Sequence, residues 1–147
     1  MTTHTDLPGD AFVAAAFDEL ITDTQNLLDA ALHATPRDAD EVKVWRSQRA
    51  AYVNAQGDWL AGLRPLPTQS GYILRSASQP GQTHRAWKIG GVWTCSCKAG
   101  DRGLFHRHTA LISALERAGE LEMLEEDAAE ARLWAKVSEV RAKYMAA

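Results

Sequence analysis

Cysteine is scarce in this sequence and long hydrophobic runs are missing. Both features exclude classes of protein to which the chain could otherwise belong. Its 147 residues include two cysteines, too few for the disulfide framework that stabilises many small secreted domains. No stretch approaches the roughly 20 apolar residues of a membrane-spanning helix. The first residues lack the basic start and apolar run of a signal peptide. We therefore expect a cytoplasmic protein with no membrane partner.

The chain also lacks internal repeats, low-complexity segments and a glycine-rich phosphate loop. The glycine pair after Lys88 forms a short turn that no helix follows, so a P-loop is excluded. No pattern places a nucleophile beside a base, so we expect no enzyme; the enzymatic alternative would need an open or redox-active metal position with Asp101 as a base. Hydrophobic residues make up 46% of the chain, enough for a packed core.

Both cysteines belong to one motif, which two histidines complete at the same spacing. Cys95 and Cys97 are one residue apart, and His106 and His108 repeat that spacing after a loop that contains two glycines. Alternate side chains of an extended segment point the same way, and glycine permits the reversal that brings the chain back. Two thiolates and two imidazoles commonly bind structural zinc, so we expect one Zn²⁺ here. Plain burial of the cysteines and redox-active thiols are the alternatives.

The segment around this motif resembles the SWIM zinc finger. That family has C-x-C, a variable loop and C-x-H in a β-β-α arrangement, and the stretch from Trp93 to Gly100 resembles its aromatic-x-C-x-C-x-x-G flank. The resemblance covers about residues 70–118. It departs at His106, where the family usually has a third cysteine, which leaves the zinc site near neutral. The resemblance implies a module that binds nucleic acid, or a protein-interaction adaptor in DNA repair or recombination.

Charge is distributed unevenly around the motif. Residues 71–110 contain six Lys/Arg and one Asp, a balance of +5, whereas residues 1–70 and 111–147 have balances of −5 and −3. A basic segment between acidic flanks is typical of a phosphate-binding surface, so we expect nucleic acid, with DNA favoured, as the partner. The alternative is that these cations pair with the chain's own acidic helices. The expected nucleic-acid contacts are Arg85, Lys88, Lys98, Arg102 and Arg107.

The hydrophobic pattern of the N-terminal half predicts a flexible tail and a helical hairpin. Residues 1–9 are assigned to the tail and residues 10–64 to the hairpin, whose first helix runs over 11–32 with Asp10 as its N-cap. The second helix is predicted over 37–62. In it Trp45, Tyr52 and Trp59 are seven residues apart, which indicates packing against the first helix, or a homodimer through residues 37–62.

The second half predicts a small sheet and more helix, which makes the fold class α+β. After a linker at 62–67, strands are expected over 71–78, 83–89 and 92–95, as an antiparallel meander whose last strand leads into the cysteines. Trp87 and Trp93 are expected to cover the metal site. His106 should precede a helix and His108 lie in its first turn. This helix is predicted to end at Gly119, with a separate C-terminal helix over 119–147.

Overall fold

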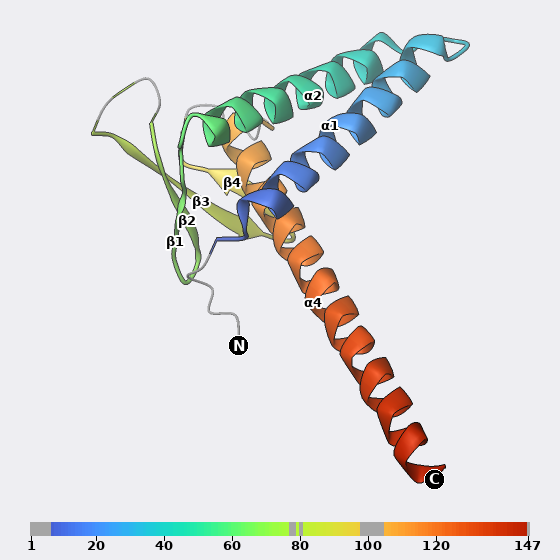
Figure 1. Ribbon diagram of the computed structural model, residues 1–147. Helices are drawn as coiled ribbons and strands as arrows, with labels where there is room; N and C mark the ends of the chain where they lie inside the picture. Colours follow the sequence, from blue (N-terminus) through green and yellow to red (C-terminus); the bar gives the residue numbers. More distant parts are fainter. Residues whose placement is uncertain (1–6, 77–78, 80, 98–104, 147) are drawn as a thin grey trace.

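The computed structural model describes residues 7–76, 79, 81–97 and 105–146, and these residues form the predicted α+β fold (Figure 1). A helical hairpin and a four-stranded antiparallel sheet both pack on the N-terminal part of one long helix. The helices are α1 (Asp10–His33), α2 (Ala39–Leu60) and α4 (Arg107–Met145). The strands are β1 (Leu66–Pro67), β2 (Gly71–Arg75), β3 (Thr83–Ile89) and β4 (Val92–Cys95).

The N-terminal ends of α1 and α2 define where the helical hairpin starts and where it turns back. α1 begins at Asp10 behind Gly9, so Asp10 lies in the first turn and the prediction that it is the N-cap is wrong. Its carboxylate still lies at the positive end of the helix dipole. α2 begins after Asp38, whose carboxylate accepts hydrogen bonds from the backbone N–H groups of Asp40 and Glu41 at 2.9 and 3.3 Å. This side-chain cap fixes the point at which the chain turns back.

The main core lies where the hairpin, α4 and the sheet meet. Phe17 of α1, Leu74 of β2 and Leu111 of α4 are at most 1% exposed. Tyr52 and Trp59 of α2 join this core, while Trp45 packs on a second, smaller cluster between the hairpin helices. The aromatic stripe of α2 is therefore a packing surface within the chain, as the seven-residue spacing predicted.

The sheet has the strand order β1-β2-β3-β4, and its register decides which side chains face α4. Tyr72 pairs with Ala86, and Ala86 pairs with Cys95, so these three lie on one face, against α4. The predicted meander is confirmed. The predicted linker at 62–67 is partly wrong, because Leu66–Pro67 forms β1 at the sheet edge, where a proline costs no ladder hydrogen bond. Residues 77 and 78 of the first predicted strand lie outside the described residues.

α4 is continuous for 39 residues, so the predicted helix end at Gly119 is wrong. Gly119 lies inside the helix beside Pro8 and does not cap a helix end. A Cβ added at Gly119 would lie 4.0 Å from the side chain of Pro8. The flexible-tail prediction fails for residues 7–9: Leu7 packs against the core, and the backbone N–H of Gly9 donates to Glu122 at 3.0 Å. Residues 1–6 lie outside the described part of the chain. None of the described helices, α4 included, combines the length and apolar character needed to cross a membrane.

Gly71 provides a test of the contact between β2 and β3. A Cβ added there would collide with the backbone carbonyl of Ala86, the residue that pairs with Cys95. We predict that Gly71→Ala lowers the free energy of unfolding by about 1–3 kcal/mol. The control is Gly57→Ala in α2, where an added Cβ meets nothing within 4 Å and alanine should stabilise the helix by up to about 1 kcal/mol. Urea unfolding of both variants measures the difference, and equal stability of Gly71→Ala and the natural protein would contradict the register.

Candidate metal centre

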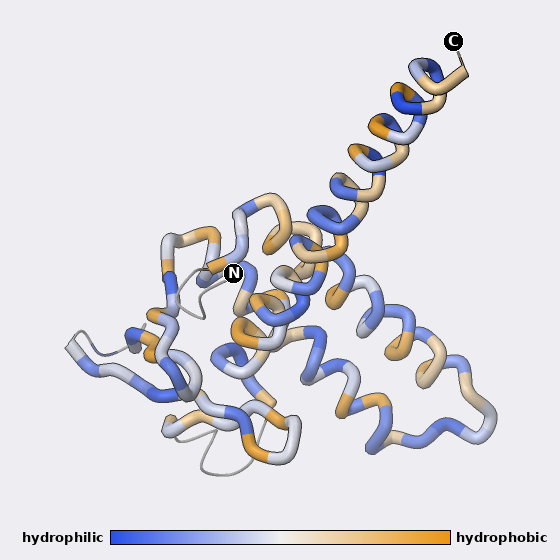
Figure 2. The backbone as a smooth tube through the Cα atoms, turned by 90° about the horizontal axis from the view of Figure 1, so that it is seen from below, coloured by the Kyte–Doolittle hydropathy of each residue, from blue (hydrophilic) through white to orange (hydrophobic). Residues whose placement is uncertain are grey.

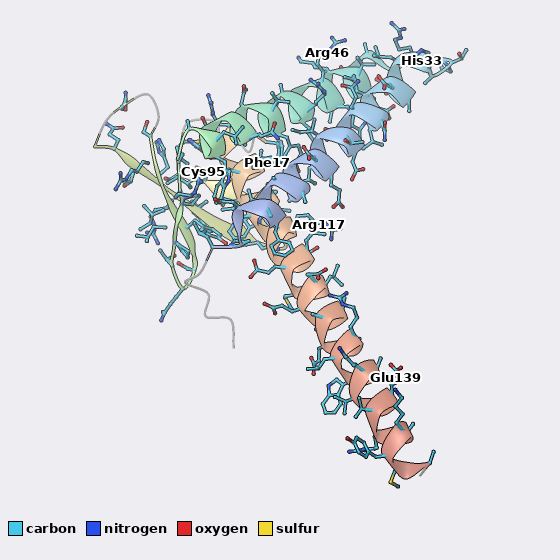
Figure 3. The ribbon with its side chains drawn as sticks, in the orientation of Figure 1. Phe17, His33, Arg46, Cys95, Arg117 and Glu139 are labelled. Carbon is cyan, nitrogen blue, oxygen red and sulfur yellow. The ribbon has the colours of Figure 1, made fainter. Side chains whose placement is uncertain are left out.

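The two cysteines and two histidines come together where the sheet meets α4. Cys95 ends β4 and Cys97 follows it, while His106 directly precedes α4 and His108 lies in its first turn, as predicted. One ligand atom from each of the four lies within 4.8 Å of the others. Figure 3 labels Cys95 beside the first turns of α4. The sequence motif is thus a spatial cluster.

Ser96, between the cysteines, fixes the strand side of the cluster. Its backbone N–H donates to the carbonyl of Arg85, and its hydroxyl accepts from the backbone N–H of Arg85, both at 2.9 Å. This pairing extends the β3–β4 ladder one residue beyond Cys95. The chain bends at Ser96 and Cys97, directly after β4, and with Ser96 held on β3 the thiols of both neighbouring cysteines lie in the cluster at the start of α4.

Thr109 holds the helix side of the cluster. The backbone N–H of His106 donates to the Thr109 hydroxyl at 3.0 Å, and that oxygen lies 3.5 Å from Nδ1 of the His106 ring. Thr109 is 3% exposed, so its position is fixed by the core. The ring is therefore oriented with its other nitrogen, Nε2, toward Cys97. Sequence reasoning missed Thr109, although its place three residues after an N-cap is typical of a capping box.

The distances within the cluster match a four-coordinate ion with nitrogen and sulfur ligands. Cys95 Sγ lies 3.6 Å from His108 Nδ1, and Cys97 Sγ lies 3.0 Å from His106 Nε2. Metal bonds of about 2.3 Å to sulfur and 2.0–2.1 Å to nitrogen separate the two atoms by about 3.6 Å in a tetrahedron. The first pair has this separation and the second needs to open by roughly 0.6 Å. Thiolate and imidazole ligands suit a soft transition metal rather than Ca²⁺ or Mg²⁺.

Burial sets the protonation of the cluster. Removal from water raises the pKa of Cys95 to about 11. Burial also lowers the pKa of His108 to about 4, with help from the neighbouring rings of His106 and His84. At neutral pH His108 is thus a neutral ligand, whereas a metal ion must displace the proton of Cys95. Metal affinity should therefore fall as the pH falls. His84 is partly buried, with its ring centre 5.2 Å from that of His108, and stands outside the four-ligand group.

Trp87 lies on the wrong face of the sheet to cover the metal centre. It pairs with Thr94 and not with Cys95, and side chains alternate along each strand, so it lies on the face opposite the cysteine. The prediction for Trp87 is therefore wrong. Trp93 does share the face of Cys95, and its ring contacts that of Tyr72 at a centroid distance of 5.7 Å. The sequence could not decide these faces because they depend on the register of the ladder.

The predicted nucleic-acid contacts fall into three groups in the structure. Arg107 donates two hydrogen bonds to Asp58 of α2, at 2.7 and 2.8 Å, and Lys88 donates to Glu116 of α4 at 2.8 Å. These two cations pair with the chain's own acidic helices, as the alternative interpretation held. Arg85 is exposed on the open face of the sheet, away from α4. Lys98 and Arg102 lie outside the described residues.

The open face carries a second arginine that sequence reasoning missed as a site residue. Arg75 ends β2 two positions after Ile73, which pairs with Arg85, so both arginines point away from α4. A groove of about 910 Å³ beside this face is lined by Arg75, Ile73 and the chain between α2 and β1. β2 contains three apolar residues in a row, Tyr72 to Leu74, so the sequence had no polar-apolar alternation that could assign Arg75 to this face, and only the register of the ladder does so.

No family model, curated protein or solved structure matches the chain. Four protein ligands fill a tetrahedral coordination shell and leave no position for water, which is the arrangement of a structural metal site.

The contact between Arg107 and Asp58 tests whether the cation next to His108 is structural. Asp58 is well shielded, with its side chain 13% exposed. We predict a coupling energy of about 1 kcal/mol in a double-mutant cycle of Arg107→Ala and Asp58→Ala. The control cycle uses Arg132 and Glu125, whose side chains are 65% and 59% exposed and should couple by less than about 0.5 kcal/mol. Urea unfolding of the natural protein and the six variants gives both values, and equal coupling in the two cycles would contradict a structural role for Arg107.

Proposed function

We propose that the chain is a SWIM-type structural-zinc module. One Zn²⁺ bound by Cys95, Cys97, His106 and His108 would join the last strand to α4. The nitrogen and sulfur ligand set, the order of two strands followed by a helix, and the buried cysteines support this proposal. The zinc would supply folding free energy rather than chemistry, since the sheet buries few side chains of its own.

The proposed partner of this module is nucleic acid, with DNA favoured. The observation that carries this proposal is the open face of the sheet, where Arg75 and Arg85 are both exposed and Trp87 is half-buried. β2, β3 and β4 contain no acidic residue, so nothing on these strands repels phosphate. Arginine contacts to phosphate and stacking on an aromatic ring are the interactions that bind nucleic acid without a deep pocket.

A protein-interaction adaptor is the second candidate function. The ion pairs of Lys88 with Glu116 and of Arg107 with Asp58 favour it, because they occupy two of the five cations assigned to phosphate. An adaptor would use the same zinc-stabilised fold without contacting nucleic acid. The salt dependence of DNA binding distinguishes the two candidates, because phosphate contacts weaken steeply with added salt.

The zinc proposal predicts the metal content of the purified protein. We expect one zinc per chain by elemental analysis, and its loss in Cys95→Ser and His106→Gln, which each remove a ligand. His33→Gln at the end of α1, distant from the cluster (Figure 3), makes the same change as His106→Gln and should keep the metal. Chelation should expose β2, β3 and β4 to hydrogen exchange, while α1, α2 and the buried part of α4 that packs on them stay protected. Zinc retained by Cys95→Ser, or hydrogen exchange unchanged by chelation, would refute the proposed site.

The nucleic-acid proposal predicts that the open face governs affinity. We expect Arg75→Glu with Arg85→Glu to weaken DNA binding at least tenfold and to lower the slope of log affinity against log salt by about 2, since two phosphate contacts are lost. Fluorescence anisotropy with labelled duplex DNA at several salt concentrations measures both. Lys43→Glu with Arg46→Glu makes the same charge change at exposed positions of α2 and serves as the control. Equal weakening in both variants would show that net charge, and not the open face, determines binding.

A further inference from the structure

The part of α4 beyond the core presents a long helical surface with no partner among the described residues. α4 buries residues between Thr109 and Ala118, but from Met123 to Ala146 every residue except Ala128 is exposed. Figure 1 shows this stretch extending alone from the body to the C-terminus. We call Met123–Met145 the projecting segment; it is roughly 35 Å long at 1.5 Å per residue. Helices in proteins owe most of their stability to a packed face, and none of the described residues outside the segment packs on it to provide one.

Large apolar side chains lie on one side of the projecting segment. Leu133, Val137, Val140 and Tyr144 recur at intervals of four, three and four residues, which places them on one stripe, and Trp134 borders it. All five are between 40% and 81% exposed. Figure 2 shows hydrophobic positions recurring along α4 up to its end. A continuous apolar stripe with a tryptophan is typical of a contact surface between proteins.

The stripe continues toward the core through two carboxylates. Glu130 and Glu126 extend the same alternation of three- and four-residue intervals. Both are exposed and would be costly to bury against an apolar partner. A suitable partner must therefore present apolar side chains along one part of its length and cations along another.

The projecting segment itself has this distribution when its direction is reversed. Residues 123–130 contain four acidic residues and no basic one, whereas residues 131–145 contain four basic residues and one acidic. A parallel pair would bring like charges together along the whole contact. An antiparallel pair would place the acidic half of each copy against the basic half of the other, and a two-fold axis produces this arrangement automatically.

We propose that the projecting segment pairs antiparallel with the same segment of a second copy, forming a homodimer. The two-fold axis would pass near Trp134, midway along the segment, so that Leu133 and Val137 of both copies meet at the centre. Glu126 and Glu130 of each copy would lie near Arg141 of the other. The globular parts then sit at opposite ends of the helix pair and do not compete for the same space. The aromatic stripe of α2 has no part in this contact, because Tyr52 and Trp59 are buried within their own chain.

Sedimentation equilibrium over about 1–100 μM protein tests the dimer, a range in which weak pairing changes the average mass. We expect the mass to rise from the 16.1 kDa of one chain toward twice that value. A protein that remains at the mass of one chain throughout would overturn the proposal.

Two matched variants locate the contact. Leu133→Glu with Val140→Glu should raise the dissociation constant of the dimer at least tenfold, because it places two charges on the stripe. Ala135→Glu with Ala142→Glu adds the same charges, also seven residues apart, on the opposite side of the helix and should leave a dimer. All four positions are exposed, so the fold of the body and the metal content should not change. A dimer that survives the first pair of substitutions would overturn the assigned surface.

The salt dependence of the dissociation constant distinguishes antiparallel from parallel pairing. An antiparallel pair is held by attraction between opposite charges, so the dissociation constant should rise from low to high salt and Glu126→Lys with Glu130→Lys should weaken the dimer. A parallel pair is opposed by repulsion between like charges, so salt would tighten it. Tightening with added salt would overturn the antiparallel arrangement.

Discussion

Cys95 and His108 bring the last strand against the first turn of α4, and the position of the sheet depends on this junction. α4 buries seven residues between Thr109 and Ala118, whereas the described strands bury few, chiefly Leu74, Ala86 and Cys95 itself. Apolar burial therefore anchors α4 to the helical hairpin more firmly than it anchors the sheet to α4. Further connections between the sheet and α4 come from the cluster, from the ion pair of Lys88 with Glu116, and from the partly buried rings of Tyr72 and Trp93.

Local sequence patterns predicted the parts of the fold that depend on neighbouring residues. The C-x-C and H-x-H spacings were sufficient to predict the cluster, because extended chain and a helix start orient side chains in a fixed way. The prediction that a helix ends at Gly119 was wrong because the residues next to it hold the helix together. Arg117 forms ion pairs with Glu19 and Glu120, and Ala118 is fully buried. Those contacts outweigh the cost of one glycine inside a helix, about 1 kcal/mol.

The electrostatic surface was harder to predict than the fold, because charges pair across long sequence separations. Asp58 and Arg107 are 49 residues apart and Lys88 and Glu116 are 28 apart, and no local pattern joins them. A segment that is basic in composition can therefore present less positive charge than its residue count suggests. The remaining positive charge on the sheet is positioned by the alternation of side chains and by the strand register. Together they place Arg75 and Arg85 on the face away from α4.

The continuity of α4 gives one element two separate roles. Its first turns carry two of the four cluster side chains and its next turns fill the core, while the projecting segment carries an apolar stripe that the body does not use. A helix break at Gly119 would have let the C-terminal part fold back and cover that stripe within the chain. Because α4 runs through the glycine without a break, the part of the helix that carries the stripe extends away from the body (Figure 1). The open face of the sheet and the stripe then lie on different parts of the molecule, so a partner bound to one need not displace a partner bound to the other.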